Sequence, residues 1–364
     1  MYRKTLLINE KGIEFQGYSI NSFKPSTGEL IFNTAMTGFV EIISDPSYIN
    51  QLVTFTSSHI GNYGMTNEDL ESEEPRISGL ITRSLTSKPS SWRSQQSLTD
   101  WLNNYSIPYS WGFDVRSITK HLRESGSSTF ALGEDIDSKE LLSIAMKAKS
   151  IIGDASALTA GVGEQNPRNC VGKIGILDLG SKNSIENIIR SYNLDTIRLS
   201  PELSADKILS LDLKGLIISN GPGDPRSLVG VIEIVKQLIG KLPIFGICLG
   251  HQLLGLALGI NVEKLSFGHH GSNHPVKVEG FDNALITAQN HGFTLENINK
   301  TINHKEFGEI NQFATNLNDG SNEGLSIWES NAYSVQFHPE SGPGPSDGKK
   351  LFEPFISLIE NSED

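Results

Sequence analysis

From residue 173 onward, segments typical of buried strands alternate with segments typical of helices. The strand-like runs are 173–178, 195–199, 215–219 and 242–247. The helix-like runs are 182–192, 204–211, 227–239 and 250–258. Because strands that alternate with helices need crossover connections, this order predicts an α/β fold with a doubly wound, mostly parallel sheet. Sites in such sheets form at the carboxyl ends of the strands, so we expect chemistry directly after Ser219 and Ile247.

The N-terminal part of the chain has a different pattern, in which short apolar runs are separated by turns rich in Gly, Pro and Asn. These runs are 5–7, 31–32, 51–55 and 79–81. Helical spacing follows at 97–104 and 117–124, and a capping box at Asp137 opens a helix that extends to about residue 149. The mixture predicts an α+β or β-rich domain.

Residues 151–171 separate the two patterns, because they lose all periodicity and collect Gly, Ala, Asn and Pro. We therefore predict an N-terminal domain at 1–150, a linker at 151–171 and the α/β domain at 172–364.

Charge and cysteine content exclude several classes of protein. The chain carries 30 lysines and arginines against 42 aspartates and glutamates, a net charge of −12, which disfavours nucleic-acid binding. Cys170 and Cys248 can form one disulfide at most, unlike a secreted, disulfide-rich scaffold. The apolar run 5–8 is too short for a signal peptide, and a histidine and a glutamine interrupt the stretch 242–260. We expect a soluble cytoplasmic protein that contacts no membrane.

Cys248 lies in the run 246–250, Gly-Ile-Cys-Leu-Gly, between a predicted strand and a predicted helix. This is the arrangement of a nucleophile elbow, with a thiol in place of a serine hydroxyl. The flanking glycines allow a sharp turn, and the following helix directs its N-terminus at the sulfur, which favours the thiolate. A buried structural cysteine is the alternative, and the context favours the nucleophile.

The loop 219–225, Ser-Asn-Gly-Pro-Gly-Asp-Pro, follows the preceding predicted strand. Its backbone amides, together with that of Leu249, are candidates to stabilise an oxyanion formed when Cys248 attacks a carbonyl carbon. An ordinary strand-to-helix turn explains the loop equally well.

A thiol nucleophile needs a base, and the base needs a residue that orients it. Pro339 favours an extended conformation at His338. Residues two apart on an extended segment point to the same side, so Glu340 can hold the imidazole of His338. We interpret this His-Pro-Glu triplet as the base and its orienter.

Three histidines, His269, His270 and His274, lie in one predicted loop. A zinc site there would lack a nearby cysteine or carboxylate, so we expect a loop that shapes the structure and no metal. The chain also has neither a phosphate-binding P-loop nor a dinucleotide fingerprint, so any ATP is expected to bind another chain.

These motifs together resemble the triad-type glutamine amidotransferases. Over nearly the whole chain, the sequence is similar to the small-subunit family of carbamoyl-phosphate synthetase. The segments that carry this similarity are 32–38, 41–48, 60–64, 219–225 and 267–276. The N-terminal segments distinguish this family from other amidotransferase subunits.

The resemblance implies that Cys248 is the nucleophile, His338 the general base and acid, and Glu340 the residue that orients it. It also implies a set of positions that bind the glutamine substrate, in which Ser47 is assigned by the resemblance alone. The set is Ser47, Gly221, Gly223, Leu249, Gln252, Asn290, Gly292 and Phe293.

The same resemblance implies a reaction and a partner. Glutamine would be hydrolysed through a glutamyl thioester, and the ammonia would pass to a large subunit in a heterodimer or a higher assembly. That subunit would use ATP, Mg²⁺ and bicarbonate to make carbamoyl phosphate for arginine and pyrimidine synthesis. This chain itself would carry no cofactor.

Three alternatives remain from the sequence. The chain could be an amidotransferase subunit of another synthase, although the segment 36–48 argues against this. It could be a stand-alone hydrolase of another γ-glutamyl compound. It could also be a regulatory subunit without activity, which the intact Cys248, His338 and Glu340 disfavour.

Overall fold

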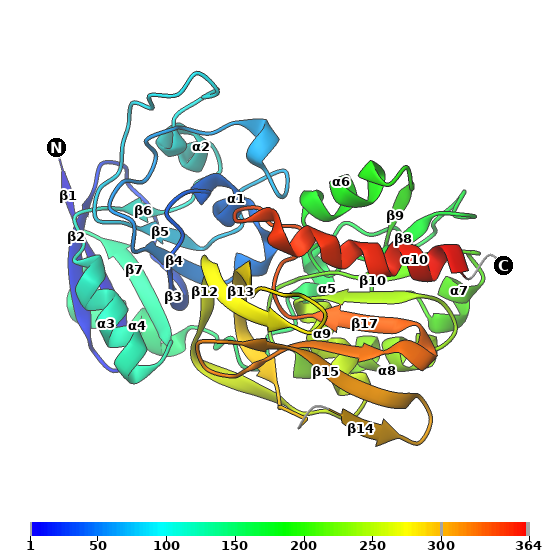
Figure 1. The fold of residues 1–364 in the computed structure, drawn as a ribbon. Coiled ribbons are helices and arrows are strands. Elements are labelled where there is room, and N and C mark those ends of the chain that lie inside the picture. Colours follow the sequence, from blue (N-terminus) through cyan, green and yellow to red (C-terminus); the bar gives the residue numbers. More distant parts are fainter. Residues whose placement is uncertain (1, 299–300, 362–364) are drawn as a thin grey trace. The chain divides into compact units, whose positions relative to one another are not determined.

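The computed structural model describes residues 2–298 and 301–361, and the chain divides into two compact units (Figure 1). The N-terminal unit comprises Met1–Asp154 and Ser266–Gly271. The C-terminal unit comprises Ala155–Leu265 and Ser272–Asp364. Each unit has its own sheet and its own hydrophobic core.

The sheet of the N-terminal unit has the strand order β2-β1-β7-β3-β4-β5-β6. Its strands are β1 (Arg3–Asn9), β2 (Glu14–Ser19), β3 (Ser26–Asn33), β4 (Gln51–Phe55), β5 (Gly79–Ile81), β6 (Tyr109–Ser110) and β7 (Thr129–Glu134). Strands β3, β4, β5 and β6 are parallel, while β1 pairs antiparallel with β2 and β7, and β7 pairs antiparallel with β3. The unit therefore has one parallel half, whose strand ends all lie at the same edge.

The helices of this unit are α1 (Phe39–Ser44), α2 (Leu98–Asn104), α3 (Val115–Ser125) and α4 (Ser138–Lys147), with short turns η1 (Pro46–Tyr48) and η2 (Asn67–Asp69). Aspartate side chains start two of them: Asp114 accepts from the backbone N–H of Ser117, and Asp137 accepts from that of Lys139. Helix α3 buries Ile118 and Leu122 against the sheet and directs polar residues outward. The helices that the sequence predicts at 97–104, 117–124 and from Asp137 are confirmed.

The sheet of the C-terminal unit has the order β13-β12-β15-β16-β17-β11-β10-β8-β9, with β14 on β15. Its strands are β8 (Ile174–Leu177), β9 (Thr196–Leu199), β10 (Gly215–Ile218), β11 (Ile244–Ile247), β12 (Val262–Val278), β13 (Leu285–Leu295), β14 (Thr301–His304), β15 (Gly308–Asn316), β16 (Asn322–Ile327) and β17 (Ala332–Val335). Strands β9, β8, β10, β11 and β17 are parallel, and β16 and β15 continue the sheet antiparallel. The predicted parallel arrangement is confirmed for these five strands, whereas β12, β14, β15 and β16 form antiparallel pairs, which the sequence pattern did not indicate.

Helices cover both faces of this sheet. They are α5 (Ala157–Ala160), α6 (Asn183–Ser191), α7 (Ala205–Leu209), α8 (Val229–Leu238), α9 (Leu249–Ala257) and α10 (Glu353–Asn361), with turns η3 (Pro225–Ser227), η4 (Trp328–Ser330) and η5 (Ser346–Phe352). Helices α6 and α10 pack into one core with the parallel strands, and α8 packs on α9. The predicted doubly wound α/β fold class is confirmed.

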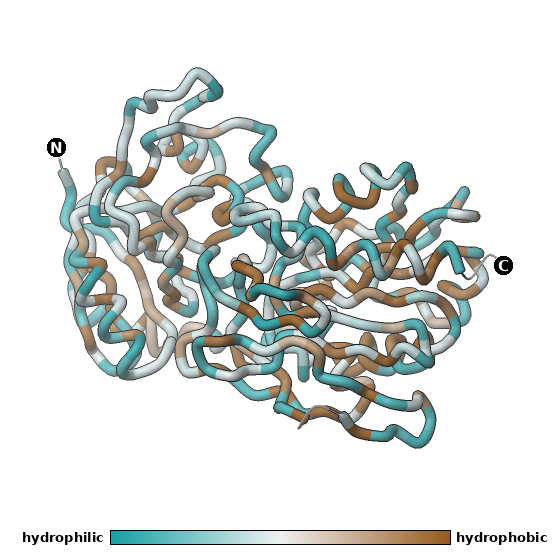
Figure 2. The backbone as a smooth tube through the Cα atoms, in the orientation of Figure 1, coloured by the Kyte–Doolittle hydropathy of each residue, from teal (hydrophilic) through white to brown (hydrophobic). Residues whose placement is uncertain are grey.

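Hydropathy follows this architecture. Figure 2 shows apolar residues along the central parallel strands, where β8, β10 and β11 are buried at every position. Strands that are covered on both faces have no solvent-facing positions, which explains their unbroken apolar runs. Among the described residues, no helix combines the length and the apolar character needed to cross a membrane.

Candidate active site

Cys248 lies at the junction of β11 and α9, where it precedes the first residue of the helix. Its backbone has φ 53° and ψ −100°, a strained conformation for a residue with a side chain. The glycines on either side have no room for a Cβ: at Gly250 it would lie 2.1 Å from the carbonyl oxygen of Ile218, and at Gly246 it would lie 2.8 Å from that of Gly250. The sharp turn predicted from the Gly-Ile-Cys-Leu-Gly run is therefore present.

The thiol of Cys248 is almost fully buried and has two polar neighbours. Its Sγ lies 3.6 Å from the carbonyl oxygen of Asn290, to which the thiol donates. Gln336 donates from Nε2 to the same sulfur over 3.7 Å. The sulfur is thus held at the start of α9, where the helix dipole favours negative charge.

His338 follows β17 and is fixed at both its backbone and its ring. Its N–H donates to the carbonyl oxygen of Ala288 over 2.9 Å, and Nδ1 lies 2.6 Å from Oε1 of Glu340. With Nδ1 donating to the carboxylate, Nε2 carries the lone pair of the neutral ring. Nε2 has no hydrogen bond of regular geometry among the described residues, and Cys248 lies close enough to change the pKa of this imidazole by charge and hydrogen bonding.

The pKa shifts of His338 and Glu340 indicate that both side chains are charged in the folded chain. Burial lowers the pKa of His338, but the charges of Glu340 and Cys248 outweigh it and raise this pKa to about 10. Burial raises the pKa of Glu340, but Lys182 and His338 outweigh it and hold this pKa at about 2. The glutamate therefore stays ionised, and it favours a proton on the imidazole.

Lys182 is a further residue of this site, and the sequence analysis did not identify it. Its ammonium is 1 % exposed and lies 3.0 Å from Oε1 of Glu340. It also donates over 2.7 Å to each of the carbonyl oxygens of Ser341 and Gly342. The signal that could have found it is its position at the start of the predicted helix 182–192, in the turn that follows the predicted strand 173–178, where parallel sheets place their sites.

The loop 219–225 packs beside the turn that carries Cys248. Asn220 accepts from the N–H of Lys182 over 3.2 Å and donates to the carbonyl oxygen of Gly180 over 3.0 Å. At Gly221 a Cβ would lie 2.2 Å from the carbonyl oxygen of Leu179 and 2.9 Å from Cδ2 of Leu249, so only glycine fits this approach. The two segments expected to supply oxyanion-binding amides are therefore neighbours.

Two glutamines connect the predicted glutamine-binding residues to the thiol. Gln252 donates from Nε2 to the carbonyl oxygen of Phe293 over 2.9 Å and to Oε1 of Gln336 over 3.0 Å, and Gln336 in turn reaches Cys248. The ring of Phe293 has the cations of Lys264 and Arg226 at 5.1 and 5.2 Å from its centroid. The segment from Asn290 to Phe293 is thus anchored beside the sulfur.

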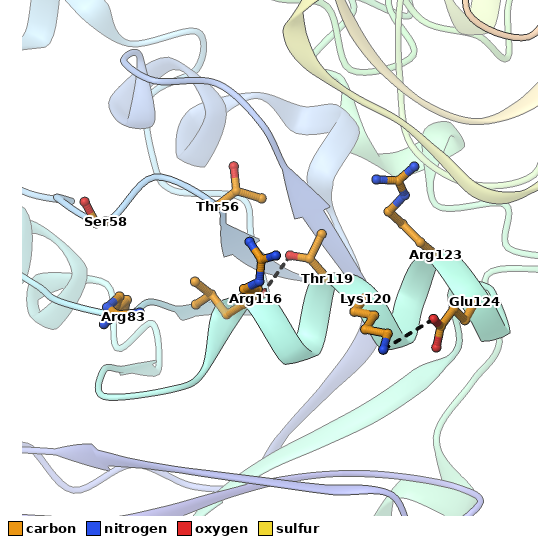
Figure 3. Close-up of a pocket in the computed structure, with 9 residues that line it drawn as sticks. Thr56, Ser58, Arg83, Arg116, Thr119, Lys120, Arg123 and Glu124 are labelled. Carbon is orange, nitrogen blue, oxygen red and sulfur yellow. Dashed lines mark hydrogen bonds and ion pairs between the residues drawn. The ribbon is translucent and has the colours of Figure 1, made fainter.

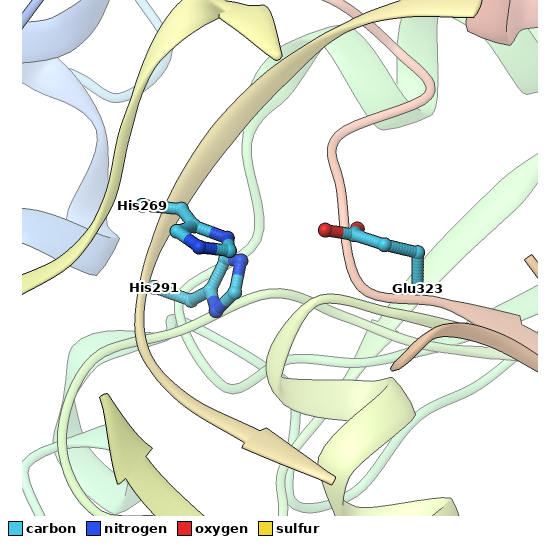
Figure 4. Close-up of side chains that lie close together, drawn as sticks. All are labelled: His269, His291 and Glu323. Atoms are coloured by element: carbon cyan, nitrogen blue, oxygen red, sulfur yellow. The ribbon is translucent and has the colours of Figure 1, made fainter. Parts of the chain in front are cut away.

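A buried polar network supports this segment from behind. The His291 ring nitrogens lie 2.6 Å from the carbonyl oxygen of Phe293 and 2.6 Å from Oε1 of Gln289. Gln289 donates to both carboxyl oxygens of Glu323, at 2.9 and 3.0 Å, and Asn316 donates to the same carboxyl at 2.7 Å. Figure 4 shows the side chains of His291 and Glu323. Burial raises the pKa of Glu323 to about 8, and the hydrogen bonds from Asn316 and Gln289 offset only part of this effect.

The remaining residues singled out in the sequence belong to both units. Gly223 and Gly292 lie in the loop 219–225 and in β13, both within the C-terminal unit. Ser47 lies in η1 of the N-terminal unit, where its N–H donates to the side chain of Asp45 over 2.8 Å. The prediction that His269, His270 and His274 lie in a loop is wrong, because all three belong to the long strand β12. His269 and His270 are part of the N-terminal unit and His274 of the C-terminal unit.

The C-terminal unit thus has a strained, buried cysteine at a strand-to-helix turn, and it also has a buried, hydrogen-bonded histidine–glutamate pair. These are the features of a thiol-dependent amidotransferase site. The comparison with protein families agrees, since residues 176–358 match the model of "Glutamine amidotransferase class-I". Residues 7–132 match the model of "Carbamoyl-phosphate synthase small chain, CPSase domain".

Individual relatives identify one family within the glutamine amidotransferases. The chain is 41 % identical over 365 residues to the carbamoyl phosphate synthase pyrimidine-specific small chain of Bacillus subtilis, covering 99 % of this chain and 97 % of that one. It is 39 % identical to the carbamoyl phosphate synthase small chain of Bacillus caldolyticus, covering 98 % and 96 %. Among solved structures, a glutamine amidotransferase of Thermotoga maritima matches 54 % of this chain and 86 % of its own length, with 19 % identity and a TM-score of 0.35. The chain belongs to the carbamoyl phosphate synthase small-chain family, the glutamine amidotransferase component of that enzyme.

Proposed function

We propose that the C-terminal unit hydrolyses L-glutamine to glutamate and ammonia through a glutamyl thioester on Cys248. The observation that supports this most directly is the buried series of charged groups around the sulfur. Lys182 pairs with Glu340, Glu340 holds Nδ1 of His338, and His338 is close enough to Cys248 to be affected by its charge. A nucleophile, a base and an orienter are the minimum that thiol acyl transfer needs.

In the first half of the proposed reaction, the thiolate attacks the side-chain amide carbon of glutamine and forms a carbon–sulfur bond. The carbonyl oxygen becomes an oxyanion, which the backbone amides near Gly221, Gly223 and Leu249 stabilise. When the carbon–nitrogen bond breaks, the imidazolium of His338 gives its proton to the leaving nitrogen, and ammonia departs.

In the second half, the now neutral His338 accepts a proton from water, whose oxygen attacks the thioester carbon. The carbon–sulfur bond breaks, glutamate leaves and the thiolate returns. Glu340 stays ionised throughout and stabilises the imidazolium, which agrees with its lowered pKa. Lys182 positions Glu340, since burial without this cation would favour the neutral carboxyl.

Glutamine recognition is proposed for the residues around the sulfur in the C-terminal unit, and for Ser47 of the N-terminal unit. The amide segment Asn290–Phe293 and Gln252 lie beside Cys248, so they are placed to fix the substrate before attack. The proposed set is Ser47, Gly221, Gly223, Leu249, Gln252, Asn290, Gly292 and Phe293.

The ammonia is proposed to pass to a large subunit that binds ATP, Mg²⁺ and bicarbonate and makes carbamoyl phosphate for arginine and pyrimidine synthesis. The family membership of the chain supports this partner, and residues 1–150 are the proposed docking domain, joined to the domain at 172–364 by the linker 151–171. A closed passage suits the chemistry, because free ammonia is mostly protonated near neutral pH and is then not nucleophilic. The complex is proposed to be cytoplasmic, and this chain to need no cofactor of its own.

The test is the substitution Cys248→Ser in the assembled complex, with carbamoyl phosphate formation measured from glutamine and from ammonium salts. We expect glutamine-dependent synthesis to be abolished and ammonia-dependent synthesis to remain. Cys170→Ser is the matched control, because Cys170 is also buried but lies in the predicted linker. Glutamine-dependent synthesis that survives Cys248→Ser contradicts the assignment of the nucleophile.

A further inference from the structure

The N-terminal unit contains a pocket of about 770 Å³ that plays no part in the proposed glutamine chemistry. Figure 3 shows that helix α3 forms one wall, with Arg116, Thr119 and Arg123, and that Thr56 and Arg83 come from other segments. A volume of this size is within the range of pockets that bind small molecules. The pocket therefore has the dimensions of a ligand site.

Its position in the fold is the position at which α/β sheets bind ligands. Thr56 directly follows β4, and Arg83 follows β5 after one intervening residue. Strands β4 and β5 are parallel neighbours, so their carboxyl ends meet at the same edge of the sheet. Crevices at the carboxyl ends of parallel strands are the usual ligand sites of such sheets.

The spacing along α3 places the polar lining on one side of the helix. Arg116, Thr119, Lys120 and Arg123 follow at intervals of three, one and three residues, which is the pattern of a single helical face. Ile118 and Leu122 point instead into the hydrophobic core. The apolar face thus fixes the direction in which the basic face projects.

The pocket carries an excess of positive charge. Three arginines and one lysine line it, against a single carboxylate, Glu124. Glu124 pairs with Lys120 over 3.8 Å. Within residues 2–298 and 301–361, no carboxylate forms an ion pair with Arg83, Arg116 or Arg123. The chain as a whole has a net charge of −12, so this concentration of guanidinium groups runs against its composition.

We propose that this pocket binds a small molecule through a phosphate group. A phosphate dianion matches several guanidinium groups at once, because each arginine offers parallel N–H donors to two of its oxygens. Ser58 adds a further hydroxyl group to the lining, whereas the hydroxyl of Thr56 already donates to the carbonyl oxygen of Asn33 over 3.3 Å. The hydroxyl of Thr119 already donates to the carbonyl oxygen of Val115 over 2.7 Å, so its oxygen presents lone pairs and is less suited to an anion than the arginines are. Recognition therefore rests on the guanidinium groups.

The concave shape favours a small anion over an acidic protein segment. A partner chain that docks through charge uses an extended surface, whereas these cations line one hollow at the strand ends. Glutamine is excluded as the ligand, because it carries no net charge at neutral pH. The proposed phosphate site does not depend on the glutaminase mechanism, so each can be tested without the other.

The test is isothermal titration calorimetry of the full chain at low ionic strength, with three probes: inorganic orthophosphate, inorganic diphosphate and AMP. We expect saturable binding of at least one probe, weakened by added salt because the contacts are charged. Tighter binding of AMP than of both inorganic probes identifies a nucleotide-like ligand, whereas tighter binding of either inorganic probe than of AMP identifies inorganic phosphate or a simple phosphate ester.

The variant Arg116→Gln/Arg123→Gln removes two of the three unpaired guanidinium groups and is expected to weaken binding at least about tenfold. Arg83→Gln, on a different segment, is expected to weaken it as well. The matched control is Lys139→Gln/Lys147→Gln, which removes two exposed charges from helix α4 of the same unit. Thermal melting of each variant shows whether it is folded, and glutaminase turnover is expected to be unchanged in all of them.

Three results overturn the proposal. The first is no binding of any of the three probes by the folded wild-type chain. The second is equal loss of binding in the control and in the α3 variant, which assigns the effect to net charge alone. The third is tighter binding of an oligoglutamate peptide than of every phosphate probe, which assigns the pocket to an acidic protein partner.

Discussion

The buried lysine of the C-terminal unit and the arginines of the pocket in the N-terminal unit differ in how their positive charge is neutralised. In the C-terminal unit, Lys182 is fully buried and is fixed by Glu340 and by two backbone carbonyl groups. In the N-terminal unit, Arg116 and Arg123 are exposed, and no described carboxylate pairs with them. A buried cation must be neutralised within the fold, whereas an exposed cation is stabilised by water and stays available to an anion that binds from solution. The difference separates a site built to perform chemistry from one built for recognition.

The largest effect is expected from His338→Asn, which removes the proposed base but keeps a polar side chain. Glutamine hydrolysis measured as kcat should fall by about 10²- to 10⁴-fold, the range for loss of a general acid–base group. Ammonia-dependent synthesis by the assembled complex is the internal control and should be unchanged. A fall of less than tenfold would mean that another group takes the proton.

The next effect concerns the stability of the buried pair. Lys182→Met removes one of the two cationic partners of the Glu340 carboxylate, the other being His338, and breaking such a buried pair costs about 3–5 kcal/mol in the free energy of unfolding, measured by urea denaturation. The double variant Lys182→Met/Glu340→Gln should recover much of this stability but no glutaminase activity.

The control for this prediction is Arg190→Met, which breaks the exposed Arg190–Glu186 pair on α6 at 2.7 Å. Exposed pairs contribute less than about 1 kcal/mol. Equal losses in the free energy of unfolding for Lys182→Met and Arg190→Met would show that burial does not make the Lys182–Glu340 pair more important than an exposed pair.

Glu323 extends the comparison, because it is a fully buried carboxyl that accepts hydrogen bonds from the side-chain amides of Gln289 and Asn316. Burial raises its pKa to about 8 from an ordinary value of 4.5, so the folded state binds its proton more tightly than the unfolded state does. This contribution to stability is complete below about pH 4.5 and is lost as the pH rises through about 8, by at most about 1.4 kcal/mol per pH unit. Glu323→Gln should flatten the decline between pH 5 and 8, as measured by urea denaturation across that range. A decline as steep as that of the wild type would show that Glu323 is ionised in the folded chain.

The smallest effect is expected at Lys120, because Glu124 already pairs with it. Lys120→Gln should weaken diphosphate binding about threefold or less, and Arg116→Gln by more, in the same calorimetric assay. A larger effect at Lys120 than at Arg116 would reverse the ranking of paired and unpaired cations in the pocket.

The sequence predicted four of the five parallel strands of the C-terminal unit, and three of these four, β8, β10 and β11, are buried at every position and so read as apolar runs. The fifth parallel strand, β17, was not predicted. The predicted strand 242–247 contains β11, and the predicted helix 250–258 overlaps α9. The antiparallel extension was not predicted. Strand β12 mixes exposed, partly buried and buried positions along Val262–Val278, so it shows neither a continuous apolar run nor strict alternation.

Site prediction depended on how local each signal was. Cys248 with its glycines, and His338 with Glu340, are short motifs that identify their own chemistry. Lys182 escaped detection because its partner Glu340 lies far along the chain and meets it only after folding. Ser47 was assigned from the family alone, and its role stays a prediction. The arginine pocket could not be predicted, since Arg83 and α3 come together only through the order of the strands.

The central claim is that Cys248 carries the glutamyl group during turnover. Acid quenching of the chain during glutamine hydrolysis, followed by proteolysis and mass spectrometry, measures this directly. We expect a glutamyl adduct on the peptide that contains Cys248. The adduct should be absent from the Cys248→Ser variant and present at the same level in the Cys170→Ser variant. Active turnover with no adduct on that peptide, or with the adduct at another residue, would contradict it.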